Sequence, residues 1–287
     1  MNTNEEIIIK VEDLYFTYAD GTKALNGINL EITKGKKVAL LGANGSGKST
    51  FFLCLNGINK PSNGQLFLHG KAYDYGKKGL LDIRTKIGIV FQDPDNQLFS
   101  ANVYQEISFG ALNIGLSREE AAARVEQAIE DLEITEFRDK PTHFLSGGQK
   151  KQVSIADILV MNPEVIVLDE PAAALDPKHT AIVNELVDKL SDRGITILIA
   201  THDVDYAYNW ADEVILFHKG TVLAQGSPEL VFLDNAVLEK TNLKKPAALR
   251  LFEDLTKSGF LPAGLSLPRN LETLEQYIYL QGRANNE

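Results

Sequence analysis

The sequence of 287 residues predicts an α/β fold with a mainly parallel β-sheet. Short runs rich in β-branched residues alternate along the chain with longer segments of helical periodicity, as in strands joined by helices. The runs at residues 165–168 and 195–200 are apolar almost throughout rather than at alternate positions. Strands of that kind have both faces covered, as they do in a parallel sheet between layers of helices.

Six runs along the chain have the strand pattern. The longest helical stretch is residues 102–163, where Ser117 is an expected N-cap and Glu120, three residues later, completes a capping box. We interpret this stretch as a helical insertion in the α/β core. The predicted strands lie at residues 7–11, 37–41, 87–91, 165–168, 196–200 and 214–217.

The last part of the chain has a helical pattern, and no strand is expected after about residue 233. Pro246 at a first helical position and Asn270 as an N-cap predict two more helices. We therefore divide the chain into a main domain, residues 1–235, and a C-terminal helical appendage, residues 236–287, that could serve in dimerisation. The appendage has an apolar stripe that packs either on this chain or on a dimer partner and consists of Leu249, Phe252 and Leu255.

Composition narrows the class of protein. The formal net charge of −10, from 29 Lys and Arg against 39 Asp and Glu, disfavours a broad nucleic-acid-binding face. The single cysteine, Cys54, excludes an internal disulfide framework and a four-thiolate zinc site. Neither apolar run approaches the roughly 20 residues of a membrane-spanning helix, and residues 1–10 lack the features of a secretion signal. We expect a cytoplasmic chain that serves a membrane, if at all, from its surface.

A phosphate-binding loop is predicted at residues 42–49, which have the spacing G-x-x-x-x-G-K-[ST] between a strand and a helix. The glycines let backbone N–H groups point inward at phosphate, and the helix start adds its positive end. We expect Lys48 to contact the β- and γ-phosphates and Ser49 to bind Mg²⁺. The predicted nucleotide contacts of this loop are Asn44, Gly45, Ser46, Gly47, Lys48, Ser49 and Thr50.

An acidic pair follows the apolar strand at residues 165–168. In parallel sheets, ligands bind at the carboxyl ends of the strands, where Asp169 and Glu170 are expected. Asp169 suits the Mg²⁺ shell, directly or through water, and Glu170 could orient and deprotonate an attacking water. One acid at a strand end is often only solvated, but two beside a phosphate loop indicate a catalytic role.

A second anion-binding helix start is predicted at residues 145–149, Leu-Ser-Gly-Gly-Gln. Ser146 caps a helix whose first turn carries two glycines, so its backbone N–H groups are bare. Alone, this pentapeptide would be an ordinary helix start. Together with the phosphate loop and the acidic pair, it indicates a second contact to the same kind of nucleotide.

In these three motifs the chain resembles the ATP-binding-cassette ATPases, with residues 42–49 as the Walker A motif, 165–170 as Walker B and 145–149 as the signature motif. The resemblance implies a P-loop NTPase core with a mainly parallel sheet, an antiparallel N-terminal β part, a helical subdomain at about 102–163 and the C-terminal helical appendage. It also implies ATP and Mg²⁺ as ligands, and two chains joined head to tail so that each signature motif completes the partner's site.

The same resemblance assigns roles to residues outside the three motifs. Gln92 is similar to the Q-loop glutamine that senses Mg²⁺ and the attacking water, and His202 to the switch histidine that contacts the γ-phosphate. Tyr18 is similar to the aromatic residue that stacks on adenine, although a place in the strand core is the alternative. The implied catalytic residues are Glu170, His202 and Gln92; the Mg²⁺ ligands are Ser49, Gln92 and Asp169; and the contacts across the dimer are Ser146, Gly147, Gly148, Gln149 and Asp176.

Within that family, residues 91–99 and the C-terminal region are similar to the ATPase subunits of energy-coupling-factor importers, most of all the cobalt-transport subunits (CbiO-like). The resemblance implies a motor on the cytoplasmic face of the cell membrane. Its partners would be a second ATPase subunit, identical or a sibling, a transmembrane coupling subunit and a substrate-binding membrane subunit. The cargo would be cobalt or nickel, or alternatively a vitamin. Apolar groups for docking, some of which could instead be domain core, are expected within residues 92–110 at Leu98, Phe99, Val103, Ile107 and Phe109.

Two positions depart from the family pattern: Gln152 stands where Arg is frequent, and Ala174 where Ser or Gly is usual. Neither touches a catalytic role. Cassette ATPases of translation or DNA repair usually have two cassettes or a long coiled coil, which are not visible here, and a nucleotide-sensing scaffold would lack a catalytic residue. No cargo-metal site is expected, because the histidines are scattered, at His69, His143, His179, His202 and His218.

Overall fold

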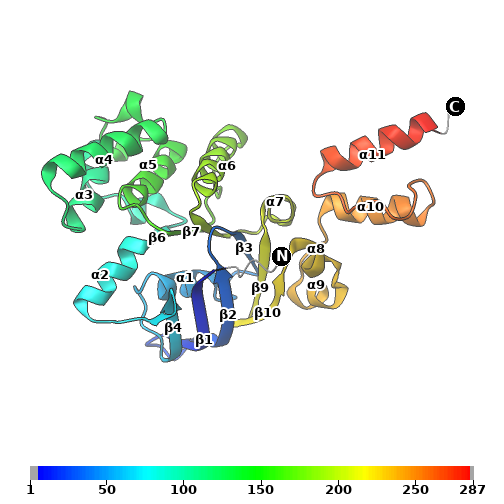
Figure 1. The fold of residues 1–287 in the computed structure, drawn as a ribbon, viewed down its shortest axis with the longest axis horizontal. Helices are drawn as coiled ribbons and strands as arrows, with labels where there is room; N and C mark the ends of the chain where they lie inside the picture. Colours follow the sequence, from blue (N-terminus) through cyan, green and yellow to red (C-terminus); the bar gives the residue numbers. More distant parts are fainter. Residues whose placement is uncertain (1–5, 285–287) are drawn as a thin grey trace.

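A computed structural model describes residues 6–284 of the chain. The two sheets form the body of the molecule, helices α3 to α6 lie above it, and helices α10 and α11 extend away from it on the right of the view (Figure 1). Residues 1–5 at the N-terminus and residues 285–287 of the expected appendage lie outside the described residues.

The N-terminal part of the chain forms an antiparallel sheet with the strand order β2-β1-β4-β5. The central strand, β1, pairs antiparallel with both β2 and β4, so the expected antiparallel N-terminal β part is confirmed. The strands are β1 (Ile7–Thr17), β2 (Lys23–Thr33), β4 (Asn63–Leu68) and β5 (Lys71–Ala72).

The second sheet has the strand order β10-β9-β3-β8-β7-β6, and its strands are parallel except β10, which pairs antiparallel with β9. The mainly parallel sheet expected from the sequence is therefore confirmed. Each expected strand at 37–41, 87–91, 165–168, 196–200 and 214–217 is present to within one residue at either end. The strands are β3 (Lys37–Leu41), β6 (Ile87–Val90), β7 (Val165–Asp169), β8 (Thr196–Ala200), β9 (Glu213–His218) and β10 (Thr221–Gly226).

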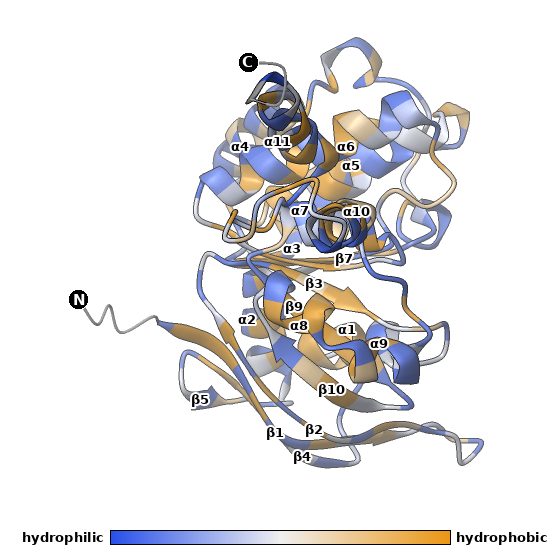
Figure 2. Ribbon diagram, turned by 90° about the vertical axis from the view of Figure 1, so that its right-hand side faces the viewer, coloured by the Kyte–Doolittle hydropathy of each residue, from blue (hydrophilic) through white to orange (hydrophobic). Residues whose placement is uncertain are grey.

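Strand β8 shows why its sequence is apolar almost throughout: all five of its residues are buried. Ile197 and Ile199 belong to a core that includes helices α3 to α6, whereas Leu198 and Ala200 belong to a second core with helix α1 (Lys48–Leu55) and the antiparallel sheet. Successive side chains of a strand point to opposite faces, so one strand serves both cores. Figure 2 shows the resulting apolar layer of strands, β3 and β7 among them, through the middle of the molecule.

Helices occupy the segment between β6 and β7, as expected for residues 102–163. Ser117 and Glu120 form the predicted capping box at the start of α4. Helix α2 precedes β6, and α6 and α7 follow β7 and β8. The helices are α2 (Lys77–Lys86), α3 (Val103–Asn113), α4 (Arg118–Asp131), α5 (Gly147–Leu159), α6 (Pro177–Asp192) and α7 (Val204–Trp210).

The C-terminal helices lie where the sequence predicts them, but some of their boundaries differ from the prediction. Asn270 caps α11, accepting a hydrogen bond from the Thr273 N–H at 2.9 Å, as expected. Pro246 is the N-cap rather than the first helical residue, because its ψ of 142° is extended. The seven-residue helix α9 was not expected. The helices are α8 (Pro228–Leu233), α9 (Asn235–Thr241), α10 (Ala247–Lys257) and α11 (Leu271–Ala284).

The apolar stripe of α10 packs within this chain. Leu249 belongs to the larger core, and Phe252 forms a separate small cluster with Leu261 and Leu274, against which Leu255 packs. The first of the two alternatives is therefore the observed arrangement for these three stripe residues. Across the described range, no helix combines the length and apolar character needed to cross a bilayer.

Candidate active site

The phosphate loop connects β3 to α1, and two of its glycines are required by their surroundings. Gly42 has a φ of 148°, and a Cβ there would overlap the carbonyl oxygen of Phe217. Gly47 has a φ of 109°, and a Cβ would come within 2.8 Å of the Ala24 carbonyl oxygen. Residues with a side chain would be strained at both positions. The loop therefore keeps an open cradle of backbone groups at the start of α1.

Two side chains of the loop, those of Lys48 and Ser46, have surroundings that suit anion binding. Lys48 donates to the carbonyl oxygens of Gly42 at 2.7 Å and Ala43 at 3.4 Å. Burial lowers the pKa of the Lys48 ammonium, while Glu170 and Asp169 act in the opposite direction. Within the described structure, the buried Oγ atom of Ser46 has no hydrogen-bond partner. An unpaired buried hydroxyl is costly, so this one fits a site whose partner is a ligand.

The carboxylate of Glu170 lies at the carboxyl end of β7, next to Asp169. Its backbone is left-handed, with a φ of 47°, and its N–H donates to the Ala200 carbonyl oxygen at 3.0 Å. Burial raises the pKa of Glu170, with Lys48 opposing the shift. The Oε1 atom is 3.0 Å from Nε2 of His202, but the two atoms are not aligned as a hydrogen bond, and Oε1 has no hydrogen-bond partner among residues 6–284. Oε1 is thus a buried carboxylate oxygen beside the phosphate loop, and the role of Glu170 as proton acceptor stays a prediction.

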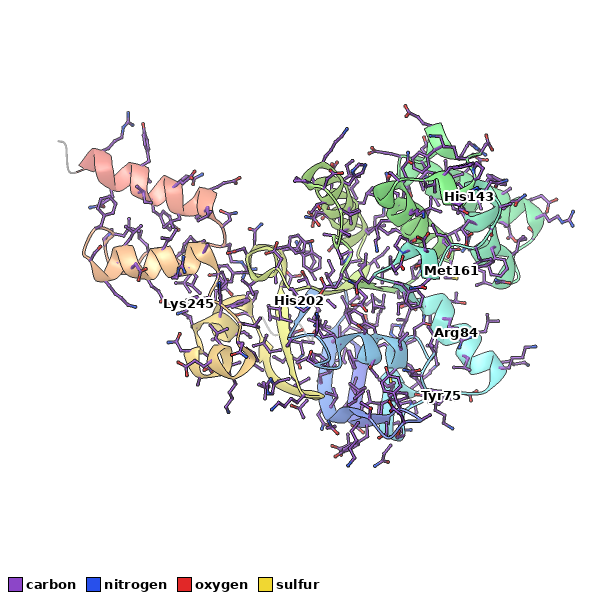
Figure 3. All side chains as sticks on the ribbon, turned by 180° about the vertical axis from the view of Figure 1, so that it is seen from behind. Tyr75, Arg84, His143, Met161, His202 and Lys245 are labelled. Atoms are coloured by element: carbon purple, nitrogen blue, oxygen red, sulfur yellow. The ribbon has the colours of Figure 1, made fainter. Side chains whose placement is uncertain are left out.

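His202 lies two residues beyond the end of β8. Burial lowers the pKa of its imidazole, as does the charge of Lys48, and Asp169 acts against them. Figure 3 shows His202 near the middle of the molecule, whereas His143 lies far from it in the helical part. His143 therefore has no place in this site.

One cavity of about 320 Å³ gathers the residues predicted from a single chain. The sequence missed three of its lining residues at the end of the turn after β1 and the start of β2, where no recognisable motif marks them. The predicted residues in the cavity wall are Tyr18, Asn44 to Thr50, Gln92, Asp169, Glu170 and His202, and the three unpredicted ones are Thr22, Lys23 and Ala24.

Tyr18 lies one residue beyond β1, so it is not part of the strand core. Its hydroxyl is 2.8 Å from Oγ1 of Thr50, and its ring meets Phe16 edge to face at 4.9 Å. The side chain is 41% exposed. This position leaves an aromatic surface available beside the phosphate loop, and adenine stacking stays a prediction.

The signature residues lie outside this cavity. Ser146 and Gln149 form a capping box at the start of α5, so this predicted helix start is present. A Cβ at Gly148 would overlap the His179 side chain on α6, which explains the second glycine by packing. Asp176 caps α6 by accepting from the N–H groups of Lys178 and His179. A single chain therefore does not bring these predicted residues to its own phosphate loop.

The comparison with known families agrees with this geometry. Residues 25–173, which span the phosphate loop, the signature motif and the acidic pair, match the family model described as ABC transporter. The chain belongs to the ABC transporter family.

Relatives in the ABC transporter family cover nearly all of the chain. It is 50% identical over 259 residues to the energy-coupling factor transporter ATP-binding protein EcfA3 of Clostridium perfringens, covering 90% of this chain and 91% of that protein. It is 47% identical over 255 residues to the corresponding protein EcfA of Methanocaldococcus jannaschii, covering 89% and 91%. These identities place the chain among the energy-coupling-factor ATP-binding subunits.

Solved ABC structures share the fold. One is cbiO1 from Clostridium perfringens, described as part of the ABC transporter complex cbiONQ, with a TM-score of 0.73 and 48% identity over 88% of this chain and 100% of that chain. Another is a dimeric ATP-binding cassette in a post-hydrolysis state, bound to ADP and Pi. It has a TM-score of 0.70 and 29% identity over 77% of this chain and 99% of that chain.

Proposed function

We propose that two copies of this chain, or one copy and a sibling, close head to tail around two MgATP and drive an energy-coupling-factor importer. Membership of the family makes the chain an ABC transporter ATPase. The observation that carries the proposal is the single cavity in which the phosphate loop, Gln92, the acidic pair and His202 meet. The signature residues lie outside that cavity, and a second chain could present its own signature residues to it. This arrangement supports the proposed dimer.

The cavity residues fit a nucleotide triphosphate with a hard cation. The glycine cradle leaves backbone N–H groups for phosphate, and Lys48 adds a point charge. Ser49, Gln92 and Asp169 offer only oxygen ligands, which Mg²⁺ prefers. Mg²⁺, when bound by these residues, would neutralise charge on the phosphates. The free hydroxyl of Ser46 supports the same assignment.

Hydrolysis follows from the arrangement of Glu170 and His202. Glu170 accepts a proton from water, the water oxygen forms a bond to the γ-phosphorus, and the bond from that phosphorus to the β–γ bridging oxygen breaks. The products are ADP and inorganic phosphate. His202 lies beside the same carboxylate, from where it would contact the γ-phosphate of a bound nucleotide. Ser146, with the N–H groups at the start of α5, covers that phosphate from the partner chain.

The five predicted docking residues differ in their exposure, and Leu98 is partly buried and packs against the larger core. Val103 and Ile107 are completely buried, so for these two the alternative of a place in the domain core is the observed one, and they do not belong to a docking surface. Phe99 and Phe109 are 66% and 45% exposed, and their rings meet edge to face at 4.8 Å. We assign this exposed aromatic pair to the transmembrane coupling subunit. The chain would then lie on the cytoplasmic face of the membrane as a peripheral subunit.

The chain division proposed for this importer subunit is a main domain of residues 1–235 and a C-terminal appendage from residue 236. Helices α10 and α11 carry exposed apolar residues, including Tyr279 at 61% and Leu280 at 63% exposed. We assign them to the contact between the two ATPase subunits. Replacing both by Lys should weaken ATP-dependent dimerisation in analytical ultracentrifugation.

The test is hydrolysis by the purified chain with Lys48→Ala and Glu170→Gln as variants. Lys48→Ala should abolish turnover. Glu170→Gln should stop turnover while a stable dimer accumulates with ATP, because nucleotide still binds and the proton acceptor is gone. Glu185→Gln on α6, far more exposed, is the matched carboxylate control and should match the wild type. Normal turnover in Glu170→Gln would overturn the assignment.

The cargo is decided by transport measurements, because the membrane subunit selects it. Similarity to cobalt-transport subunits makes cobalt or nickel the first cargo to test and a vitamin the second. Copurification with small integral membrane proteins, followed by uptake of labelled cargo in vesicles, distinguishes these. A chain that hydrolyses ATP but captures no membrane subunit from its own membranes would be a soluble cassette ATPase instead.

A further inference from the structure

Lys151 is an almost completely buried lysine on the signature helix, and the roles described so far do not use it. Its side chain is 1% exposed in the fifth position of α5. The Nζ atom donates to the carbonyl oxygens of Phe91 at 2.8 Å and Gln92 at 2.9 Å. The side chain therefore connects the signature helix directly to the backbone that carries Gln92.

Two further contacts bind the same turn to α5. Gln97 donates to the Ser154 carbonyl oxygen at 2.9 Å and accepts from the Phe91 N–H at 3.3 Å. Lys150 pairs with Asp95 at 2.5 Å, although Asp95 is well exposed. The turn of residues 91–97 is thus fixed to α5 at both of its ends, and Lys151 makes the buried part of that attachment.

The burial of Lys151 makes the loss of its hydrogen bonds costly. Burial lowers the pKa of its ammonium to about 8, although Asp169 and Asp93 act in the opposite direction. A buried ammonium is expensive unless its hydrogen bonds are made. If α5 moves, the turn must move with it or leave that charge without partners. A cavity of about 330 Å³ beside this contact is lined by Gln92, Lys151, Gly147 and residues 173–175, so the turn, the signature helix and the loop after β7 meet here.

We propose that Lys151 is a positioning residue that couples closure of the dimer to hydrolysis, by transmitting the position of the signature helix to Gln92 of the same chain. The inference rests on the proposed function, since it needs a dimer in which each α5 start completes the partner's site. Contact of the partner's nucleotide with the start of α5 then sets the backbone at Gln92, whose side chain lines the chain's own cavity.

Gln152, the next residue, supplies a matched control. It is also buried, at 7% exposure, and donates to a carbonyl oxygen, that of Leu132 after α4, at 3.0 Å. It makes the same kind of bond from the same helix but to a different neighbour. Lys151→Met and Gln152→Met therefore each remove a buried donor, and only the first removes the bond to the Gln92 carbonyl oxygen.

The first measurement compares turnover, nucleotide affinity and dimerisation. Lys151→Met should lower kcat by about 10- to 100-fold and leave the Kd for ATP within about threefold. In the Glu170→Gln background, Lys151→Met should leave the affinity of ATP-driven dimerisation within about threefold. The reason is that formation of the dimer does not itself require the contact from Lys151 to Gln92. Gln152→Met should keep kcat within about threefold of the wild type. Wild-type kcat in Lys151→Met would overturn the inference, as would an equal loss in Gln152→Met.

The second measurement is a double-mutant cycle with Gln92→Ala. If Lys151 acts through Gln92, adding Lys151→Met to Gln92→Ala should lower kcat by no more than about twofold further. Independent, multiplicative losses would overturn the inference. If Lys151→Met does not fold, Lys151→Gln keeps one donor and should show the same non-additivity with a smaller loss. If the wild type hydrolyses ATP and Lys48→Ala does not, the proposed function stands whatever these results are. If the wild type does not hydrolyse ATP, both the proposed function and this inference are overturned.

Discussion

Nε2 of His202 lies 3.0 Å from Oε1 of Glu170, although the two residues are 32 positions apart and follow different strands. Strands β7 and β8 are parallel neighbours, and Asp169 pairs in register with Ala200. Their carboxyl ends therefore meet at one edge of the sheet. The backbone bond from Glu170 to the Ala200 carbonyl oxygen holds the two segments together. Ladder pairing of β7 and β8 therefore brings the predicted switch histidine and the predicted catalytic glutamate together.

His202→Ala should lower kcat by roughly 100-fold, because the γ-phosphate loses a hydrogen-bonding partner in the transition state. Affinity for ATP should change little, since the phosphate loop is untouched. Steady-state hydrolysis together with equilibrium ATP binding measures both. His218→Ala, a histidine outside the cavity, is the control. A large loss of ATP affinity with unchanged kcat would contradict the role assigned to His202.

Tyr18→Ala should weaken ATP binding about tenfold, because stacking of an aromatic ring on adenine is worth on the order of 1 kcal/mol or somewhat more. Tyr18→Phe removes only the bond to Thr50 and should bind ATP nearly as the wild type does. Titration of each variant with ATP checks this pair. Equal weakening in both variants would mean that the hydroxyl, rather than the ring, is what matters.

Gly148→Ala should lower the thermal stability of the nucleotide-free chain. Its Cβ would overlap His179, and overpacking of this kind costs about 1 to 3 kcal/mol, a shift of several degrees in Tm. Gly147→Ala is the control, since a Cβ there meets only Leu175 Cδ2 at 3.6 Å, an ordinary contact. Calorimetry compares the two variants. An unchanged Tm in Gly148→Ala would show that His179 moves aside freely.

Asp157→Asn should change how stability depends on pH. Burial raises the pKa of Asp157 to about 7, and the neighbouring Glu106 carboxylate adds to the shift, while the Gln97 amide opposes it. The folded chain therefore holds this proton more tightly than the unfolded chain. The resulting contribution to the free energy of unfolding is complete below about pH 4 and is lost as the pH rises to about 7. The Asn variant lacks this loss and should be the more stable protein at pH 8.

The control for that prediction is Asp131→Asn, whose effect has the opposite sign. The Arg193 guanidinium lowers the pKa of Asp131, so its contribution is present at neutral pH and lost in acid. Asp131→Asn should therefore be slightly less stable than the wild type at pH 8. Urea unfolding at pH 5 and pH 8 measures both variants. A wild-type pH dependence in Asp157→Asn would contradict the assignment of that proton.

Phe99→Glu should prevent capture of the transmembrane coupling subunit while leaving ATP hydrolysis by the isolated chain unchanged. The side chain is exposed, so the charge does not enter the core, but an apolar docking partner would have to desolvate it. Leu233→Glu, an exposed apolar residue at the end of α8, is the control and should still copurify. Retained capture by Phe99→Glu would place the docking surface elsewhere.

The sequence predicted the parts of the fold that have strong local signals. Strands β7 and β8 were recognisable because residues buried on both faces are apolar nearly throughout, and the capping box at Ser117 and the N-cap at Ser146 are short-range patterns. Strands β2 and β4 were missed, because half-buried antiparallel strands carry mixed sequences: β4 begins with three exposed residues. Helix α9 was missed because seven residues are too few for a clear period.

The candidate site was predicted where chemistry is tied to a motif. The phosphate loop and the acidic pair require particular residue types at fixed spacing, so their positions could be predicted. Thr22, Lys23 and Ala24 line the same cavity, but only the folded hairpin brings them there. The bond from Lys151 to the Gln92 carbonyl oxygen spans 59 positions and has no sequence signal, since a lysine on a helix is ordinarily solvated.

Leu249 limits how the chain can be shortened. It is fully buried in the larger core, although it belongs to the C-terminal helices. A protein engineer who trims the chain to a minimal cassette ending at residue 235 would leave the pocket that receives Leu249 open to water. Such a truncated protein should be prone to aggregation unless the neighbouring apolar residues are also redesigned.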